Sequence, residues 1–327
     1  MAKISPMAVS GNGSLQFAVY ICSMVLQPLF TQNAHNGSLY ALAWDERDGR
    51  LFSGGADRVI AVWSADLGTQ EPLTIRTTST IYSLLFVPSN RLLFVGLSDG
   101  ALHVIDVDRK QEIAAAHVHS LGIFDLTYDP VHHWVWSAGG DGWLNVWDAD
   151  SGSKIRSIPF AQTKIRQIKA HPSLPLLAVA GDQLQIIDTD FANIQHTLIG
   201  HEGAATALCW HPKKSILFSG GKDGHLMAWA WSQSDQAVIR ISAHRFAIYR
   251  LVMDTSNEML LSASRDGTIK IWNEHTMDHV SSTARSGLAH THSINALVAG
   301  NSCFYSASDD RKIIRWKAER PALKPSE

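Results

Sequence analysis

Residues 260–276 read LLSASRDGTIKIWNEHT and contain the pattern that decides the fold. Asp266 and Gly267 separate two short, mostly apolar runs, and Trp272 follows the aspartate by six residues. An Asp-Gly pair between two such runs predicts a β-hairpin, because both residues tolerate the backbone conformation of a tight turn. The stretch therefore predicts two antiparallel strands and raises the question of why an aspartate and a tryptophan keep this separation.

The same phrase recurs along the chain and defines an internal repeat. Good copies are SGGADRVIAVW (53–63), SAGGDGWLNVW (137–147), SGGKDGHLMAW (219–229) and SASDDRKIIRW (306–316). Weaker copies are VGLSDGALHVI (95–105) and AVAGDQLQII (178–187). The turn aspartates are 41 to 44 residues apart, at Asp57, Asp99, Asp141, Asp182, Asp223, Asp266 and Asp310. A fixed period of this length indicates repeated structural units, and seven copies leave no room for a second domain.

Each unit predicts four short strands. A histidine opens the unit, an alternating apolar run such as LYALAW (39–44) follows, and two further runs end in a serine and a tryptophan. Turn residues at constant offsets, without a helical period, predict one antiparallel four-stranded sheet for each unit. The chain resembles the WD40-repeat family, whose units form the blades of a β-propeller. The resemblance covers about residues 35–316 and implies a single all-β, seven-bladed propeller.

The resemblance also explains the separation of the aspartate and the tryptophan. In this family a histidine, a serine, an aspartate and a tryptophan of one blade form a buried chain of hydrogen bonds. The matching sets in this sequence are His35/Ser53/Asp57/Trp63, His119/Ser137/Asp141/Trp147, His201/Ser219/Asp223/Trp229, His244/Ser262/Asp266/Trp272 and His290/Ser306/Asp310/Trp316. Blade 2 has Thr77, Val95 and Ile105 instead, and blade 4 has Ala161, Ala178 and Ile187. We expect apolar packing to replace the polar chain in these two blades.

Closure of the ring is predicted to need a strand from the N-terminal region. The third run of the seventh unit ends at Trp316, and the sequence after it shows no fourth run. A circular array must join its ends or leave an exposed strand edge. We expect MVLQPLF (24–30) to complete the last blade as an outer strand, where Pro28 is tolerated. The predicted organisation is an N-terminal extension (1–23), the propeller (24–316) and a C-terminal tail (317–327).

Composition indicates a folded protein from a reducing compartment. Hydrophobic residues make up 45%, and the formal net charge of −2 gives no global attraction to nucleic acid or anionic membranes. Cys22, Cys209 and Cys303 are far apart, which predicts free thiols and a cytoplasmic location. The apolar segment 15–30 is too short for a membrane span, which needs about 20 apolar residues. We interpret it as one or two strands, the alternative being a degenerate export signal.

The family resemblance places one set of side chains on the top surface, around the central channel. The fifth position after each opening histidine holds Tyr40, Tyr82, Phe124, Arg166, Thr206, Tyr249 and Asn295. Neighbouring loop positions add the basic residues Lys164, Lys222, Arg245 and Arg265. We predict that this surface binds a protein or peptide partner. The predicted binding residues are Tyr40, Tyr82, Phe124, Lys164, Arg166, Lys222, Arg245, Tyr249 and Arg265. Aromatic anchors beside cations suit a peptide that carries acidic side chains.

The same positions predict no catalytic, metal or cofactor site. Their only acidic residues, Glu202 and Asp309, lie two blades apart, so no acid/base pair results. Five of the 16 histidines belong to the expected hydrogen-bond chains, and the others lack a convincing metal-ligand spacing.

We therefore predict a non-catalytic protein-interaction platform or scaffold that is monomeric by itself. The fold does not name the partner. One alternative is nucleic-acid or anionic-lipid binding through the basic residues of blades 4 to 6. The other is a propeller hydrolase, which would need metal-bound carboxylates and histidines at the channel mouth.

Overall fold

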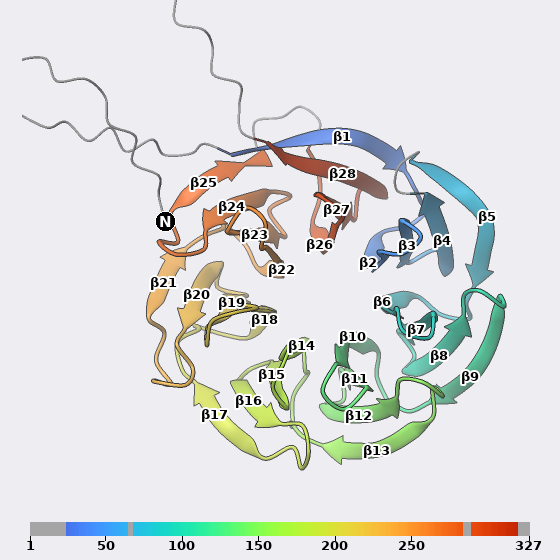
Figure 1. The fold of residues 1–327 in the computed structure, drawn as a ribbon, viewed down its shortest axis with the longest axis horizontal. Coiled ribbons are helices and arrows are strands. Elements are labelled where there is room, and N and C mark those ends of the chain that lie inside the picture. The colour runs from blue at the N-terminus through green and yellow to red at the C-terminus, as the bar shows by residue number, and fades with distance from the viewer. Residues whose placement is uncertain (1–23, 65–67, 284–288, 320–327) are drawn as a thin grey trace, which may run out of the picture.

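A computed structural model describes residues 24–64, 68–283 and 289–319. These residues form seven antiparallel sheets of four strands each, which follow one another around a central channel (Figure 1). Within each sheet the chain starts at the channel and moves outward. The predicted all-β, seven-bladed propeller is confirmed.

The four strands of every blade follow in order from the channel outward. Blade 1 holds β2 (Leu39–Asp45), β3 (Arg50–Gly55), β4 (Val59–Ser64) and β5 (Thr69–Arg76), and blade 2 holds β6 (Ile81–Val87), β7 (Leu92–Leu97), β8 (Ala101–Asp106) and β9 (Gln111–His117). Blade 3 holds β10 (Ile123–Asp129), β11 (Trp134–Gly139), β12 (Trp143–Asp148) and β13 (Lys154–Pro159), and blade 4 holds β14 (Gln167–Ala170), β15 (Leu176–Ala180), β16 (Leu184–Asp188) and β17 (Ile194–Leu198). Blade 5 holds β18 (Ala205–Trp210), β19 (Leu217–Gly221), β20 (His225–Trp229) and β21 (Ile239–Ser242), and blade 6 holds β22 (Ile248–Asp254), β23 (Met259–Ser264), β24 (Ile269–Asn273) and β25 (His279–Ser282). Blade 7 holds β26 (Ile294–Gly300), β27 (Cys303–Ser308), β28 (Lys312–Glu319) and β1 (Val25–Asn33).

The N-terminal strand completes the last blade, as predicted. Strand β1 pairs antiparallel with β28, and the register aligns Pro28 with Trp316. The proline lies at a register shift on the outermost strand, where it removes no donor from a central ladder. The pairing extends β28 to Glu319, so residues 317–319 belong to the blade and not to the expected tail. The expected extension (1–23) and residues 320–327 lie outside the described residues.

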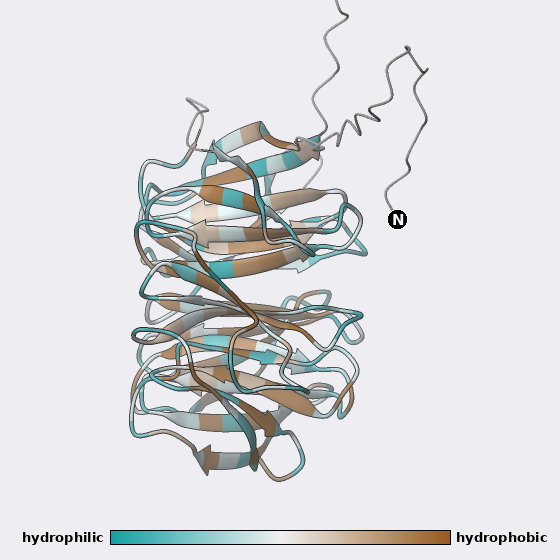
Figure 2. Cartoon of the chain, turned by 90° about the vertical axis from the view of Figure 1, so that its left-hand side faces the viewer, coloured by the Kyte–Doolittle hydropathy of each residue, from teal (hydrophilic) through white to brown (hydrophobic). Residues whose placement is uncertain are grey.

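The hydrophobic core consists of seven apolar layers, one between each pair of neighbouring blades. The layer between blades 6 and 7, for example, contains Leu261, Ile271 and Phe304 together with Leu26 from β1. Because every blade is packed on both faces, its middle strands are almost fully buried, as in β7 and β23. From the side, hydrophobic residues gather in the strands, while the loops along the two faces are largely hydrophilic (Figure 2).

A four-residue chain of hydrogen bonds occurs in blades 1, 3, 5, 6 and 7. The histidine Nδ1 lies 2.9–3.2 Å from the turn aspartate, and its Nε2 lies 2.7–3.0 Å from the serine Oγ. The tryptophan Nε1 donates to the same Oγ over 2.7–3.1 Å. The tryptophan is therefore six residues beyond the aspartate because both must reach one serine–histidine pair.

The serines and tryptophans of these chains lie inside the blades and not on a surface. The serines, each fully buried, are Ser53, Ser137, Ser219, Ser262 and Ser306. The tryptophans, each no more than 7% exposed, are Trp63, Trp147, Trp229, Trp272 and Trp316. In blade 3 the histidine has an additional neighbour, because the amide of Asn145 lies 2.8 Å from His119 Nε2. These side chains are out of reach of a partner and support the blades from within.

The chain of hydrogen bonds also holds two loops together at one end of the blade. In all five blades the aspartate accepts a further bond from the backbone N–H of the residue after the histidine, as in Arg245 N to Asp266. In these five blades the loop before the innermost strand is thereby fixed to the turn between the second and third strands. We name the face formed by these loops and turns the top face.

Blades 2 and 4 lack this chain of hydrogen bonds, and they differ in what surrounds the turn aspartate. In blade 2, Ser79 Oγ donates to the turn aspartate Asp99 over 2.6 Å, so a local serine replaces the histidine as its partner. In blade 4, Ala178 and Ile187 are fully buried, and the turn aspartate Asp182 is exposed. Apolar side chains fill the positions of the buried serine and tryptophan in both blades.

Closure by β1 predicts a difference between two leucines on that strand. Leu26 is buried, so Leu26→Ala should lower the free energy of unfolding by about 2–4 kcal/mol. Leu29 is 49% exposed, so Leu29→Ala should change it by no more than about 0.5 kcal/mol. Denaturant titration of both variants checks this. Equal effects would contradict packing of β1 into the last blade.

Because one serine serves both the histidine and the tryptophan, its substitution should lower the free energy of unfolding strongly. Ser262→Ala removes one oxygen but leaves His244 Nε2 and Trp272 Nε1 without their buried partner. We expect a loss of about 2–4 kcal/mol in the free energy of unfolding, because unsatisfied buried polar groups are costly. The exposed Ser215→Ala serves as the control and should stay within about 0.5 kcal/mol. Equivalent denaturation curves for the two variants would contradict the role of the chain.

Acid should destabilise the propeller in two steps. Burial lowers the pKa of His119 and His201, although their aspartates oppose this. The unfolded chain therefore takes up these protons first, and stability present above about pH 6.5 is lost below it. Burial alone would raise the pKa of Asp266, but hydrogen bonds from His244 and Thr268 hold it well below its usual value. Its contribution is present above about pH 4 and is lost as the pH falls further.

Urea titrations between about pH 7.5 and about pH 5.5 test the histidine step. We expect the stability of His201→Asn to depend less on pH than that of the unaltered chain, because one titrating group is gone. Exposed His292→Asn should leave the dependence unchanged. Stability that is constant or rises toward pH 5.5 would contradict the prediction.

Candidate interaction surface

The top face is hollowed at its centre by a cavity of about 280 Å³, which we name the top cavity. Its lining residues are Tyr40, Tyr82, Phe124, Arg166, Thr206, Tyr249, Arg250 and Asn295. Seven of these occupy the fifth position after the opening histidine or its equivalent, one from each blade. The structure thus brings together all seven residues that the sequence placed around the channel mouth.

Three aromatic rings form a continuous arc on blades 1 to 3. The rings of Tyr40 and Tyr82 meet edge to face with centroids 5.7 Å apart, and Tyr82 lies 5.8 Å from Phe124. The guanidinium of Arg166 lies 5.9 Å from the centroid of the Phe124 ring and extends the arc onto blade 4. Gly122 permits this packing, since a Cβ there would lie 2.8 Å from the Tyr82 ring.

The remaining polar residues of the top cavity tie neighbouring blades together. The Thr206 hydroxyl donates to Ile248 O over 2.6 Å and so links blade 5 to blade 6. The Asn295 amide donates to Leu39 O over 2.8 Å, which links blade 7 to blade 1. These two side chains therefore tie the rim of the mouth together, and the aromatic and arginine side chains line the rest of it.

Four of the predicted binding residues lie outside the top cavity. Lys164, Lys222, Arg245 and Arg265 are exposed on the loops and turns of blades 4 to 6. The guanidiniums of Arg245 and Arg265 lie 6.0 and 5.9 Å from the centroid of the Phe246 ring, which is 50% exposed. Lys164 lines a separate cavity beside Asp182 in blade 4. The basic residues form an outer arc, and of the five predicted cations only Arg166 reaches the mouth.

The side chains of the buried hydrogen-bond chains stay away from both the mouth and the channel. None of the buried serines and tryptophans named above, Ser53, Ser137, Ser219, Ser306 and Trp147 among them, lines the top cavity. The chains act on the surface indirectly, because they fix the loops that carry the exposed cations. The predicted residues therefore divide into a structural set inside the blades and a surface set on the top face.

Glu202 and Asp309, the two acidic residues among the positions predicted around the channel, each have a partner within the chain. Arg240 donates to Glu202 over 2.6 Å and lowers the pKa of that carboxyl. Asp309 accepts a bond of 2.8 Å from Asn295. Within the described ranges, none of the five predicted basic residues of this face forms an ion pair. These five basic side chains are therefore not neutralised by a carboxylate of the described residues.

Sequence reasoning missed Arg250, the eighth residue of the top cavity. Strand β22 has a bulge between Ile248 and Arg250, which interrupts the alternation of its side chains. As a result Tyr249 and Arg250, although adjacent, both face the channel. Corresponding register shifts occur in five other innermost strands. A bulge expected at the same place in every repeat would therefore have predicted that Arg250 faces the channel.

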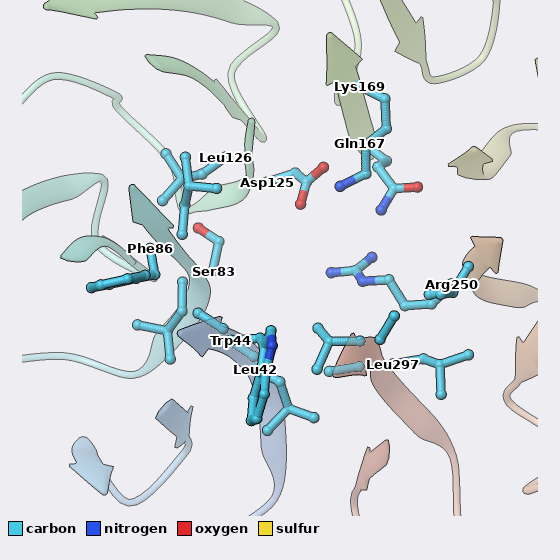
Figure 3. Close-up of a pocket in the computed structure, with 18 of the residues that line it drawn as sticks. Leu42, Trp44, Ser83, Phe86, Asp125, Leu126, Gln167, Lys169, Arg250 and Leu297 are labelled. Carbon is cyan, nitrogen blue, oxygen red and sulfur yellow. The ribbon is translucent and has the colours of Figure 1, made fainter. Parts of the chain in front are cut away.

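A second cavity of about 330 Å³ lies deeper in the channel, and we name it the channel cavity. Six of the seven innermost strands line it, and Arg250 lines both cavities. Figure 3 shows Asp125, Gln167, Lys169 and Arg250 facing its interior from three different blades, among apolar neighbours such as Leu126 and Leu297.

Two further observations concern the described ranges as a whole. No group of three or more His, Cys, Asp or Glu side chains in them is placed to hold a metal ion. They also contain no helix that is long and apolar enough to cross a membrane.

Known proteins resemble the chain in its repeats. The family model for the WD domain, G-beta repeat, matches residues 26–64, 192–230 and 236–273. Human Striatin-4 is 24% identical over 275 residues, which are 76% of this chain and 36% of that protein. Mouse WD repeat and FYVE domain-containing protein 1 is 25% identical over 242 residues, which are 71% of this chain and 59% of that protein. The match thus spans less than two thirds of the length of either relative.

Each matched repeat starts with the outermost strand of one blade and continues through three strands of the next. Residues 26–64, for example, run from β1 of blade 7 through β4 of blade 1. The matched repeats, the five complete hydrogen-bond chains and the seven four-stranded blades agree with one another: the chain is a seven-bladed β-propeller that contains WD40 repeats.

Proposed function

We propose that this chain is a non-catalytic interaction platform that binds a protein partner on its top face. The top cavity is the centre of the proposed site, and its aromatic arc beside Arg166 and Arg250 is the observation that carries the proposal. Aromatic and arginine side chains in partly enclosed positions are the usual energetic anchors of protein interfaces.

The charges of the top face favour a partner with acidic residues. The outer arc of Lys164, Lys222, Arg245 and Arg265 has no ion pairs among the described residues, while Glu202 and Asp309 are bound internally. Such a surface attracts acidic segments and accelerates their association. A nucleic-acid duplex or an anionic lipid surface would use the same cations but would not need the aromatic arc, so we favour a protein partner over these two.

We also propose a cytoplasmic location and a chain that is monomeric without its partner. Cys209 and Cys303, the two described cysteines, are unpaired, which supports a reducing compartment.

Affinity capture of partners from cells of the source organism tests the proposal. Tyr249→Ala should weaken capture by about 30-fold, equivalent to about 2 kcal/mol for loss of an aromatic anchor. Its thermal midpoint should stay close to that of the unaltered chain, because Tyr249 is only half-buried. The double variant Lys222→Glu/Arg265→Glu should weaken capture more at low salt than at high salt, because salt already screens these exposed charges.

Phe191→Ala provides a matched control. This aromatic residue is 79% exposed in the turn between β16 and β17, on the face opposite the top cavity. Capture should survive this change. Loss of the partner in Phe191→Ala alone would move the site to the opposite face. Capture that disappears after nuclease treatment would instead favour the nucleic-acid alternative.

A further inference from the structure

The channel cavity beneath the proposed site is rich in hydrogen-bond donors. The Arg250 guanidinium carries five N–H donors. Among the described residues, it donates one of them, from Nη1, to Tyr249 O over 2.9 Å. The Lys169 ammonium makes no bond to the described residues. The Oε1 of Gln167 accepts from Leu208 N, so the free part of this amide is its NH₂ group.

Acceptors in the channel cavity are fewer. Asp125 is the one carboxylate among the residues that line it, and its Oδ2 already accepts from Ile168 N over 3.1 Å. Within the described ranges, neither Asp125 nor Arg250 takes part in an ion pair within 4.0 Å. Two cations and one carboxylate leave the cavity with a formal charge of +1. Its complement is an acceptor with negative charge.

The position of Arg250 sets the route into this cavity. Arg250 lines both the top cavity and the channel cavity, so a group that passes from one cavity into the other passes this residue. Lys169 belongs to the channel cavity alone. Apolar walls, including Leu42, strengthen charge pairing because they keep the local dielectric low.

We infer that an acidic side chain of the partner inserts through the top cavity and places its carboxylate against Arg250, with Lys169 behind it. The apolar part of the inserted segment would lie on the aromatic arc. A cationic side chain suits the aromatic rings and Asp125 but would face Arg166 and Arg250, which repel it. Glutamate fits better than aspartate, because its longer stem carries the carboxylate below the rings. This inference rests on the proposed function.

A library of short peptides tests the inference without a known partner. The peptides are acetylated and amidated, random at all positions except the central one, which is Glu, Gln, Lys or phosphoserine. We expect the unaltered chain to bind the Glu set about ten- to a hundredfold more tightly than the Gln set, as is typical of a charge-assisted hydrogen bond in a partly enclosed site. A second set with Gln at the centre and a free C-terminal carboxylate distinguishes a side-chain carboxylate from a chain terminus.

Three variants locate the interaction. Arg250→Gln should abolish the preference for Glu over Gln, and Arg250→Lys should retain part of it, since lysine keeps the charge but not the planar fork. Arg76→Gln, an exposed guanidinium on β5, is the matched control and should leave the preference unchanged. Circular dichroism and the thermal midpoint establish that the variants are folded.

Several results would overturn the inference. These are equal binding of the Glu and Gln sets by the unaltered chain, a stronger preference for phosphoserine or for a free C-terminus, and an unchanged Glu preference in Arg250→Gln. Failure here is distinguishable from failure of the proposed function. If Tyr249→Ala loses partner capture while Arg250→Gln keeps its Glu preference, the top-face platform stands and the inserted carboxylate does not.

Discussion

Closure of the ring is the constraint on which the rest of the structure depends. Seven sheets packed on both faces have no free apolar surface only if the seventh meets the first, and the Asn295 bond to Leu39 O and the apolar layer between blades 7 and 1 show this contact. Strand β1 is the outermost strand of blade 7. Each sequence repeat likewise contributes its first strand to the blade before it, so no repeat completes a blade alone. The two ends of the described chain are consequently bound to each other, and unfolding at either end removes strand pairing from the same blade.

The buried hydrogen-bond chain links this architecture to the shape of the top face. It uses the histidine of one loop and the aspartate of another, so blade stability and loop position depend on the same bonds. Blades 2 and 4 are informative exceptions. In blade 2, Ser79 keeps Asp99 bonded and the loop in place, and blade 2 contributes Tyr82 to the middle of the aromatic arc. In blade 4 no such replacement holds Asp182 among the described residues, and cavities lie on both sides of its turn. The polar chain can therefore be lost without loss of the blade, and cavities flank the turn in blade 4, where no other side chain among the described residues bonds the turn aspartate.

Most of the fold is predictable from the sequence, because the repeat contains hydrogen-bonding residues that must keep fixed separations along the chain. Aspartate at a turn, and tryptophan six residues later, must both reach one serine–histidine pair, so their offsets survive where neighbouring residues vary. The last strand is harder to predict, since the end of β28 beyond Trp316 is determined by pairing with β1, which lies almost 300 residues away in the sequence. A local pattern carries no information about a partner at that distance.

The site is predictable in part, and the difference has a geometric cause. Residues at the fifth position, such as Tyr40 and Tyr249, lie on innermost strands and therefore face the channel. Lys222 and Arg265 precede the turn aspartates and lie farther from the axis, outside the top cavity. Counting alternate residues along β22 hides Arg250, because the bulge turns two adjacent side chains to the same side. A matching shift in β10 places Asp125 in the channel, where it accepts a backbone N–H of the next blade. The bulges thus help to join blades together and, at Arg250, add a cation where the top cavity meets the channel cavity.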